Sequence, residues 1–234
     1  MALNNRLWGA ERIRGELLKL GIHISKRTIQ KYMRLGRVRL TSQTWSTFVH
    51  NHAHEIWACD FLPVTDLLFR SLFAFFIIEL KSRKVIHVGV TRHPTDAWIA
   101  QQWREATPFG LTPRFLIRDN DSKFGPLFAR VASSSGITVL KTPYRAPRAN
   151  ACCERFLGSV RRECLDHLLI LREQQLSRVL QAYVSYFNRA RPHQGLQQQI
   201  PDPDAAALPD EPKDGPILAL PVLGGLHHDY RRLA

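Results

Sequence analysis

Three acidic residues, Asp60, Asp119 and Glu154, occupy positions where a carboxylate could serve as an oxygen ligand. Asp60 lies inside an apolar run, where a carboxylate is costly unless it is paired, hydrogen-bonded or bound to a cation. Asp119 directly ends the apolar residues 115–117, at the carboxyl edge where open α/β sheets place their sites. Glu154 falls in the first turns of a predicted helix, which gives rigid support to one oxygen ligand.

Each of these carboxylates also has a structural explanation when it is taken alone. Asp60 could be a buried salt-bridge partner, and Asp119 could cap a turn, as aspartates commonly do. Glu154 could complement the dipole at the N-terminus of its helix. It is the joint arrangement of the three residues, rather than any single one, that favours a functional site.

The helix predicted around Glu154 has two distinct faces. Its apolar stripe has helical spacing and consists of Cys153, Phe156, Leu157, Val160 and Cys164. A neighbouring face carries Glu154, Gly158, Arg161 and Arg162. A carboxylate followed by arginines can bind a metal at one end of a helix and DNA phosphate along the rest. We therefore expect Arg155, Arg161 and Arg162 to contact DNA.

The elements that must position these residues alternate between strands and helices. Strands are predicted at 55–64, 72–80, 84–91, 114–119 and 137–142, and helices at 96–107, 126–135, 150–165 and 173–190. A mixed sheet that carries helices is an α/β architecture.

The N-terminal residues predict a separate helical segment. Residues 8–20 place apolar side chains at helical spacing, and Gly21 ends that helix. Ser25 is the expected N-cap of a second helix that Gly36 closes. Helix, tight turn and basic helix form the outline of a helix-turn-helix, although an ordinary basic hairpin has the same outline. The expected DNA contacts are Lys26, Arg27, Gln30, Lys31 and Arg34.

Composition favours a partner that is a polyanion. The 234 residues include 33 Lys and Arg against 20 Asp and Glu, a formal net charge of +13. Such an excess favours nucleic acid or an acidic membrane surface. The most apolar segment, 72–80, has about half of the ~20 residues that a membrane helix requires, so we expect no membrane span. The four cysteines show no disulfide framework, which is typical of a reducing cytosol.

Several segments resemble the catalytic core of insertion-sequence transposases and retroviral integrases. They are IWACDF, FLIRDNDSKF, YRAPRANACCERFLGSVRRECLDHL and YFNRARPHQGL, and they span roughly residues 50–205. The 35 positions from Asp119 to Glu154 fit the Asp-Asp-(about 35)-Glu pattern of that superfamily. Residues 8–34 look like the helix-turn-helix that often precedes such cores.

The resemblance implies a ribonuclease-H-like fold, a mixed five-stranded sheet with helices on both sides and its first three strands antiparallel. It implies that Asp60, Asp119 and Glu154 converge to hold two Mg²⁺ or Mn²⁺ ions for in-line attack on a phosphodiester. Water would be the nucleophile in cleavage, and a DNA 3′-hydroxyl in strand transfer. The implied partners are double-stranded DNA, as element ends and target, and further copies of the chain in a homo-oligomer on DNA. The implied location is cytoplasmic and nucleoid-associated.

These interpretations divide the chain into a helix-turn-helix at 1–37, a linker at 38–54, a catalytic core at 55–200 and a loosely ordered tail at 201–234. Two features depart from the family pattern. Asp121 stands where many relatives have glycine, as an accessory ligand or, as we favour, a solvated turn residue. Many relatives also carry more sequence before the helix-turn-helix, which a separate reading frame or a truncated copy would explain.

Two other clusters invite a functional interpretation. His50, His52, His54 and Cys59 could suggest zinc, but they lack a CxxC pair, and we favour a polar surface strand. The segment with Arg189, Arg191, His193 and Gln194 could serve packing or DNA contact. The leading hypothesis is a DNA transposase; the alternatives are a catalytically silent DNA-binding protein and a ribonuclease-H-like nuclease.

Overall fold

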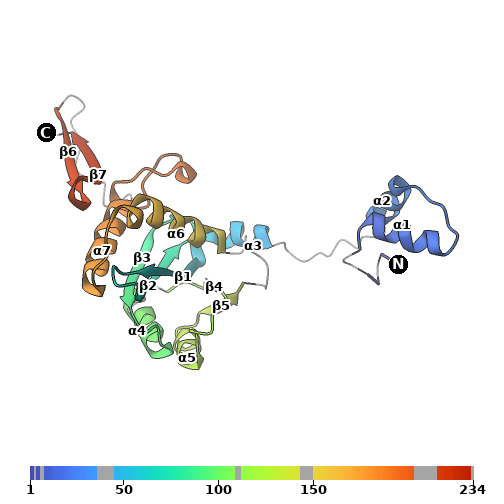
Figure 1. Ribbon diagram of the computed structural model, residues 1–234, viewed down its shortest axis with the longest axis horizontal. Coiled ribbons are helices and arrows are strands. Elements are labelled where there is room, and N and C mark those ends of the chain that lie inside the picture. Colours follow the sequence, from blue (N-terminus) through green and yellow to red (C-terminus); the bar gives the residue numbers. More distant parts are fainter. Residues whose placement is uncertain are drawn as a thin grey trace. The chain divides into compact units, whose positions relative to one another are not determined.

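The structure is a computed structural model that describes residues 1–2, 4–5, 8–35, 45–108, 112–142, 150–202 and 215–232. The chain forms two compact units, Met1–Thr44 and Trp45–Ala234, and each is described by itself (Figure 1). Among the described residues, no helix is long and apolar enough to cross a bilayer.

The described part of the N-terminal unit contains two short helices, as the sequence predicts. Helix α1 spans Ala10–Lys19 and helix α2 spans Lys26–Leu35. The helices bury Ile13 and Ile29, one from each. The hydroxyl of Ser25 accepts a hydrogen bond from the backbone N–H of Thr28 at 3.2 Å, which confirms Ser25 as the N-cap.

The second unit is built on a five-stranded sheet in the order β3-β2-β1-β4-β5. Its strands are β1 (Ile56–Thr65), β2 (Ser71–Glu79), β3 (Val85–Thr91), β4 (Phe115–Arg118) and β5 (Thr138–Lys141). The first three pair antiparallel, whereas β4 pairs parallel with β1 and β5 pairs parallel with β4. This is the mixed sheet that the resemblance implies.

Helices cover both faces of this sheet (Figure 1). They are α4 (Asp96–Ala106) and α5 (Pro126–Ser134) on one face, and α6 (Ala151–Glu163) and α7 (Glu173–Arg189) on the other. Alternate residues of β1 supply the two cores: Ala58 packs with α6 and α7, and Cys59 packs with α4 and α5. Because both faces are buried, the central strands are continuous apolar runs.

Two parts of the second unit differ from the sequence prediction. Within the predicted linker, helix α3 spans Trp45–His52, so the expected polar surface strand at its histidines is wrong. Trp45, Phe48 and Val49 stand at helical spacing and pack against the core, which explains why this segment is a helix. Residues 38–44 of that linker lie outside the described residues.

The predicted loose tail contains a β-hairpin of β6 (Ile217–Val222) and β7 (His227–Arg232). Gly224 and Gly225 both have positive φ in the turn between the strands, a conformation that favours glycine. The described 3₁₀ turns are Ala53–Glu55, Leu165–His167, Gln194–Leu196 and Leu223–Gly225. Residues 203–214 of the tail lie outside the described part of the chain.

Candidate active site

Asp60 lies near the middle of the central strand β1, and its carboxylate is partly buried. The backbone N–H of Phe61 donates to Oδ1 at 2.7 Å, and the side-chain amide of Asn150 donates to Oδ2 at 3.4 Å. Burial, followed by the negative charges of Asp119, Glu154 and Asp121, raises the pKa of Asp60 from 3.8 to about 7. Within the described residues Asp60 forms no ion pair, so the structure does not support the salt-bridge explanation.

Asp119 is brought beside Asp60 by the strand register. Ala58 of β1 is paired with Ile117 of the parallel strand β4, and each aspartate follows two residues later. Neighbouring strands lie about 4.8 Å apart, and residues two apart share a face, so both side chains start from the same side of the sheet. Burial and the charge of Asp121 raise the pKa of Asp119, against the effect of a hydrogen bond from the Asp121 backbone N–H.

Asp121 has the contacts of a turn residue. Its carboxylate accepts hydrogen bonds from both the backbone N–H and the ammonium of Lys123. Burial acts to raise its pKa, but these bonds and the charge of Lys123 outweigh that effect and lower it. The carboxylate that already has a cationic neighbour is therefore Asp121, in contrast to Asp60.

Glu154 is exposed on the first turns of α6, close enough to Asp60 for its charge to raise the pKa of that residue. The negative charges of Asp119 and Glu154 thus both act on Asp60. Among the described residues, no three His, Cys, Asp or Glu side chains are arranged as a group that could hold a metal ion. The donor chemistry nevertheless fits a divalent cation: hard oxygen atoms, mutual repulsion, and no cation paired with Asp60.

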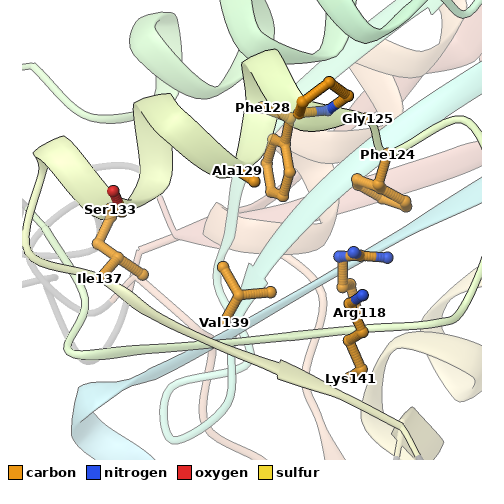
Figure 2. Close-up of a pocket in the computed structure, with 10 residues that line it drawn as sticks. Arg118, Phe124, Gly125, Phe128, Ala129, Ser133, Ile137, Val139 and Lys141 are labelled. Carbon is orange, nitrogen blue, oxygen red and sulfur yellow. The ribbon is translucent and has the colours of Figure 1, made fainter.

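Arg118 supports this edge of the sheet, and sequence reasoning missed it. Its side chain is buried, and its Nη1 donates to the backbone carbonyl of Asp119 at 2.8 Å. The guanidinium lies 4.6 Å from the ring centre of Phe124, along a pocket of about 460 Å³ between α5 and strands β4 and β5 (Figure 2). An arginine inside the run FLIRD was the available signal, since a buried charge needs a reason.

The predicted DNA contacts on α6 are all exposed. Arg161 also donates to the carbonyl of Pro63 on β1 at 3.2 Å, so this arginine lies beyond Asp60 along that strand. The guanidinium of Arg162 lies over Gly158, where an added Cβ would stand 3.1 Å from it. The residues of α6 that face solvent therefore run from Glu154 toward two arginines, as the sequence predicts.

The five predicted contacts of α2, namely Lys26, Arg27, Gln30, Lys31 and Arg34, are also exposed. Lys26 is paired with Glu11 of α1 at 3.1 Å, which reduces the charge that it can offer to DNA. Among the described residues no salt bridge holds Arg27, Lys31 or Arg34. Contact with DNA stays a prediction for all five.

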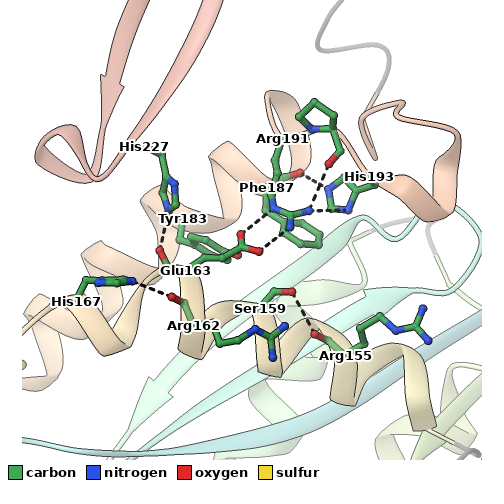
Figure 3. A network of polar contacts seen from close by, with 11 residues as sticks. Arg155, Ser159, Arg162, Glu163, His167, Tyr183, Phe187, Arg191, His193 and His227 are labelled. Atoms are coloured by element: carbon green, nitrogen blue, oxygen red, sulfur yellow. Dashed lines mark hydrogen bonds and ion pairs between the residues drawn. The ribbon is translucent and has the colours of Figure 1, made fainter.

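The segment after α7 serves packing through Arg191 and His193 (Figure 3). Arg191 binds Glu163 of α6 with two bonds, at 2.8 and 2.6 Å, and the hydroxyl of Tyr183 donates to the same carboxylate at 2.9 Å. His227 of the hairpin contacts the Glu163 carbonyl at 2.7 Å. Glu163 is the centre of this network, and nothing in its sequence position indicated that role.

The histidines of α3 and of the 3₁₀ turn after it do not share the surroundings of Cys59. His52 contacts Glu55 at 2.9 Å, whereas Cys59 is fully buried in the core beneath α4 and α5. Burial, together with the charges of Asp60 and Asp119, raises the pKa of the Cys59 thiol well above its ordinary value. The thiol is therefore protonated, which disfavours it as a metal ligand.

The second unit resembles solved integrase chains in its fold. It superposes on a chain of the simian T-cell lymphotropic virus intasome in complex with PP2A regulatory subunit B56 gamma, with a TM-score of 0.55 and 13% identity over 77% of this chain and 67% of that one. The HTLV-2 integrase catalytic core domain in complex with magnesium gives a TM-score of 0.50 and 15% identity, over 62% and 93% of the two chains. The ribonuclease-H-like fold is confirmed.

The sequence is similar to an integrase core family and to proteins of two insertion elements. Residues 135–201 match the family described as Integrase core domain. The chain is 23% identical to the insertion element IS407 31.7 kDa protein of Burkholderia multivorans, over 88% of this chain and 78% of the relative. It is 24% identical to the insertion element IS476 39.2 kDa protein of Xanthomonas euvesicatoria, over 60% and 41%. The resemblance to insertion-sequence transposases with an integrase-type core is confirmed.

Proposed function

We propose that this chain is a metal-dependent DNA transposase that cuts the ends of a mobile element and joins them to target DNA. One observation carries the proposal: Asp60 on β1 and Asp119, just after the parallel strand β4, stand at matching positions, with Glu154 close enough to raise the pKa of Asp60. Carboxylates that repel one another, with no cation paired to Asp60, form a site suited to cations. The matched integrase core family and the insertion-element relatives support the same activity.

The residues proposed to hold two Mg²⁺ or Mn²⁺ ions are Asp60, Asp119 and Glu154. When bound, such ions lower the pKa of an attacking water and stabilise the charge that develops on a leaving 3′ oxygen. The integrase core of HTLV-2 was solved in complex with magnesium, and we extend that metal to this chain as part of the proposal.

The chain's own residues orient the site. The Phe61 N–H and the Asn150 amide fix the two oxygens of Asp60, and Arg118 fixes the backbone carbonyl of Asp119. The exposed guanidiniums of Arg161 and Arg162 would bind phosphates of the strand that is cut. Binding in this way would place the attacking oxygen in line with the scissile bond, and such positioning lowers the barrier of the reaction.

The proposed partner is double-stranded DNA, as element ends and as target. Joining two ends needs two active sites, so we propose that the chain works as a homo-oligomer assembled on DNA and associated with the nucleoid. Relatives of the fold were solved in an intasome and in a trimeric form, which supports assembly. The basic α2 would add DNA contacts from the N-terminal unit.

Cleavage of a labelled duplex that carries the inverted repeats flanking this coding sequence tests the proposal. With Mg²⁺ we expect strand cleavage, and Asp119→Asn and Glu154→Gln should each reduce its rate roughly 100-fold or more, because losing a metal ligand costs several kcal/mol in the transition state. The exposed Asp166 and the α7 residue Glu173 supply matched controls, Asp166→Asn and Glu173→Gln, which should cleave at the parent rate.

The remaining outcomes separate the alternatives. Salt-sensitive binding of duplex DNA without cleavage under any metal would identify a DNA-binding protein without catalysis. Cleavage of branched or hybrid substrates without strand transfer would identify a nuclease. If Asp119→Asn or Glu154→Gln cut as well as the parent, the assignment of the three carboxylates would be wrong.

A further inference from the structure

A second polar cleft opens on the side of α6 that faces the segment after α7. Its volume is about 210 Å³, and its lining comes from β2 and the turn after it, from α6 and α7, and from the segment after α7. We name it the arginine cleft after Arg83, Arg155 and Arg191, which lie in it together with Gln194 and Gly195. Figure 3 shows Arg155 on α6 and Arg191 above it.

Arg83 comes from the turn between β2 and β3, and its side chain lines this cleft. Its backbone has a φ of 65°, a left-handed conformation that is uncommon for a residue with a side chain. Nη1 donates to the sulfur of Cys152 at 3.6 Å, whereas the buried Nε has no hydrogen-bond partner among the described residues. The guanidinium also lies against Gly195, where an added Cβ would be 3.8 Å from Nη2. The guanidinium of Arg83 therefore has donor groups left over inside the cleft.

The positive charge of the cleft is only partly compensated. Arg191 is neutralised by its paired bonds to Glu163. Burial lowers the pKa of His193, so this ring adds no charge at neutral pH. No salt bridge among the described residues holds Arg83 or Arg155. Two guanidiniums therefore remain to attract an anion into the cleft.

The size of the cleft limits the ligand to a small group. Sites for whole cofactors or drug-sized molecules measure about 300–1,000 Å³. Guanidinium groups match the oxygens of a phosphate in planar, paired hydrogen bonds. Arg155 directly follows Glu154, so the cleft begins one residue from the proposed catalytic carboxylates. Consecutive residues of a helix point about 100° apart, so the cleft opens on the face of α6 next to the one that carries Glu154.

We propose that the arginine cleft binds a backbone phosphate of DNA away from the scissile bond, through Arg83 and Arg155. This proposal rests on the proposed function, since it takes DNA as the ligand. It also assigns a role to the part of the segment after α7 that does not serve packing. Gln194 and Gly195 of this part line the cleft together with Arg83. The bound phosphate would fix how the strand crosses α6.

The experiment measures how binding of a random-sequence duplex by the full chain weakens with salt, in EDTA so that no strand is cut. Each phosphate contact contributes about 0.9 to the slope of log affinity against log salt concentration. Arg83→Ala and Arg155→Ala should each reduce the slope by about that amount. Arg130→Ala removes the same charge from the exposed side of α5 and should leave the slope unchanged.

A third variant guards against misfolding. Gln194→Glu is isosteric and removes no contact of Arg83. Its carboxylate would compete with DNA phosphate for the guanidiniums that line the same cleft. The slope should therefore fall as it does for Arg83→Ala. Gln174→Glu, at the exposed start of α7, is its matched control. Equal slopes for Gln194→Glu and Gln174→Glu, or an equal loss for Arg130→Ala and Arg155→Ala, would overturn the proposal.

The same proteins separate this proposal from the proposed function. If the slope falls in the cleft variants but the parent binds DNA without ever cleaving it, the phosphate site in the cleft is supported and the transposase activity is contradicted. Cleavage by the parent with no change of slope in the cleft variants contradicts the cleft alone. A parent chain that binds no duplex contradicts both.

Discussion

Asp60 and Asp66 show how differently two aspartates of one hairpin are treated. Asp66 follows β1 directly, and its buried carboxylate accepts bonds from the Arg70 N–H and from the guanidiniums of Arg70 and Arg92. Burial acts to raise its pKa, but these bonds lower it from 3.8 to about 2. Asp60 has carboxylate neighbours instead, and its pKa is raised to about 7.

Comparison of Asp66→Asn with the parent at acid pH should reveal how much the ionised Asp66 carboxylate stabilises the fold. A carboxylate whose pKa is depressed in the folded state stabilises the fold above its ordinary pKa, and this stability is lost as the pH falls toward the folded value. The parent should therefore be more stable than Asp66→Asn at pH 6, and the difference should shrink as the pH falls from about 4 to about 2. Urea unfolding across this range measures it; a constant difference would contradict the role of the ionised carboxylate.

For single residues, the sequence indicated which buried charges are costly, but it could not indicate which residues compensate them. An aspartate inside an apolar strand predicts some compensation, and this held for Asp60. The identity of the neighbours came only from the sheet register and the placement of α6, since Asn150 and Glu154 lie some ninety residues from Asp60. Glu163 and Arg83 gave no local signal, because their partners are distant in the chain.

Among the elements, α4 and α5 pack together in one core, and a single side chain also links them by hydrogen bonds. Asp96, the first residue of α4, accepts hydrogen bonds from the N–H groups of Gly125, Leu127 and Phe128 at 3.0, 2.7 and 2.9 Å. These groups form the start of α5, whose N–H groups have no partner within the helix. A Cβ on Gly125 would stand 2.5 Å from Asp96 Oδ2, so a glycine is needed there.

Asp96→Ala should lower the free energy of unfolding of the second unit by about 2 kcal/mol, because a charged cap and its helix dipole interaction are lost. Thermal unfolding should show a midpoint lower by about 4–8 °C. Asp166→Ala, on an exposed 3₁₀ turn, is the control and should unfold with the parent. An unchanged midpoint for Asp96→Ala would mean that solvent replaces the cap at no cost.

Most elements of the second unit were predictable to within one or two residues, because each apolar run is bounded by a turn or a capping signal. Helix α3 was missed because the polar residues around Trp45 and Phe48 hide a short apolar stripe. The hairpin was missed because the Pro and Asp content before it suggested a loose tail, although Gly224–Gly225 between two β-prone runs is a hairpin signal. Sheet order and the contacts of β6 and β7 required the fold itself.

At the level of the whole molecule, the carboxylates should make the fold sensitive to divalent cations. A ligand that binds only the folded state at 100 times its dissociation constant stabilises it by about 2.7 kcal/mol. For a chain of this length, that corresponds to a midpoint higher by about 5–10 °C. We expect such a rise with Mg²⁺ or Mn²⁺ and a much smaller one for the double variant Asp60→Asn, Asp119→Asn.

Sodium chloride at equal ionic strength separates cation binding from general screening. Screening would raise the midpoints of the parent and of the double variant alike, since a chain with a net charge of +13 repels itself at low salt. A rise with Mg²⁺ that the double variant shares in full would count against a bound ion at this site.

Ala58 and Ile117 are paired across β1 and β4, and each stands two residues before its aspartate. This spacing restricts where such a chain can gain or lose residues. Adding or removing one residue between Ile117 and Asp119 would turn the second carboxylate to the opposite face of the sheet, because side chains alternate along a strand. The connections at the far ends of the same strands carry no such restriction. Insertions and deletions are therefore tolerable in the loops that lead into β4, whereas the two steps from each paired residue to its aspartate must stay fixed.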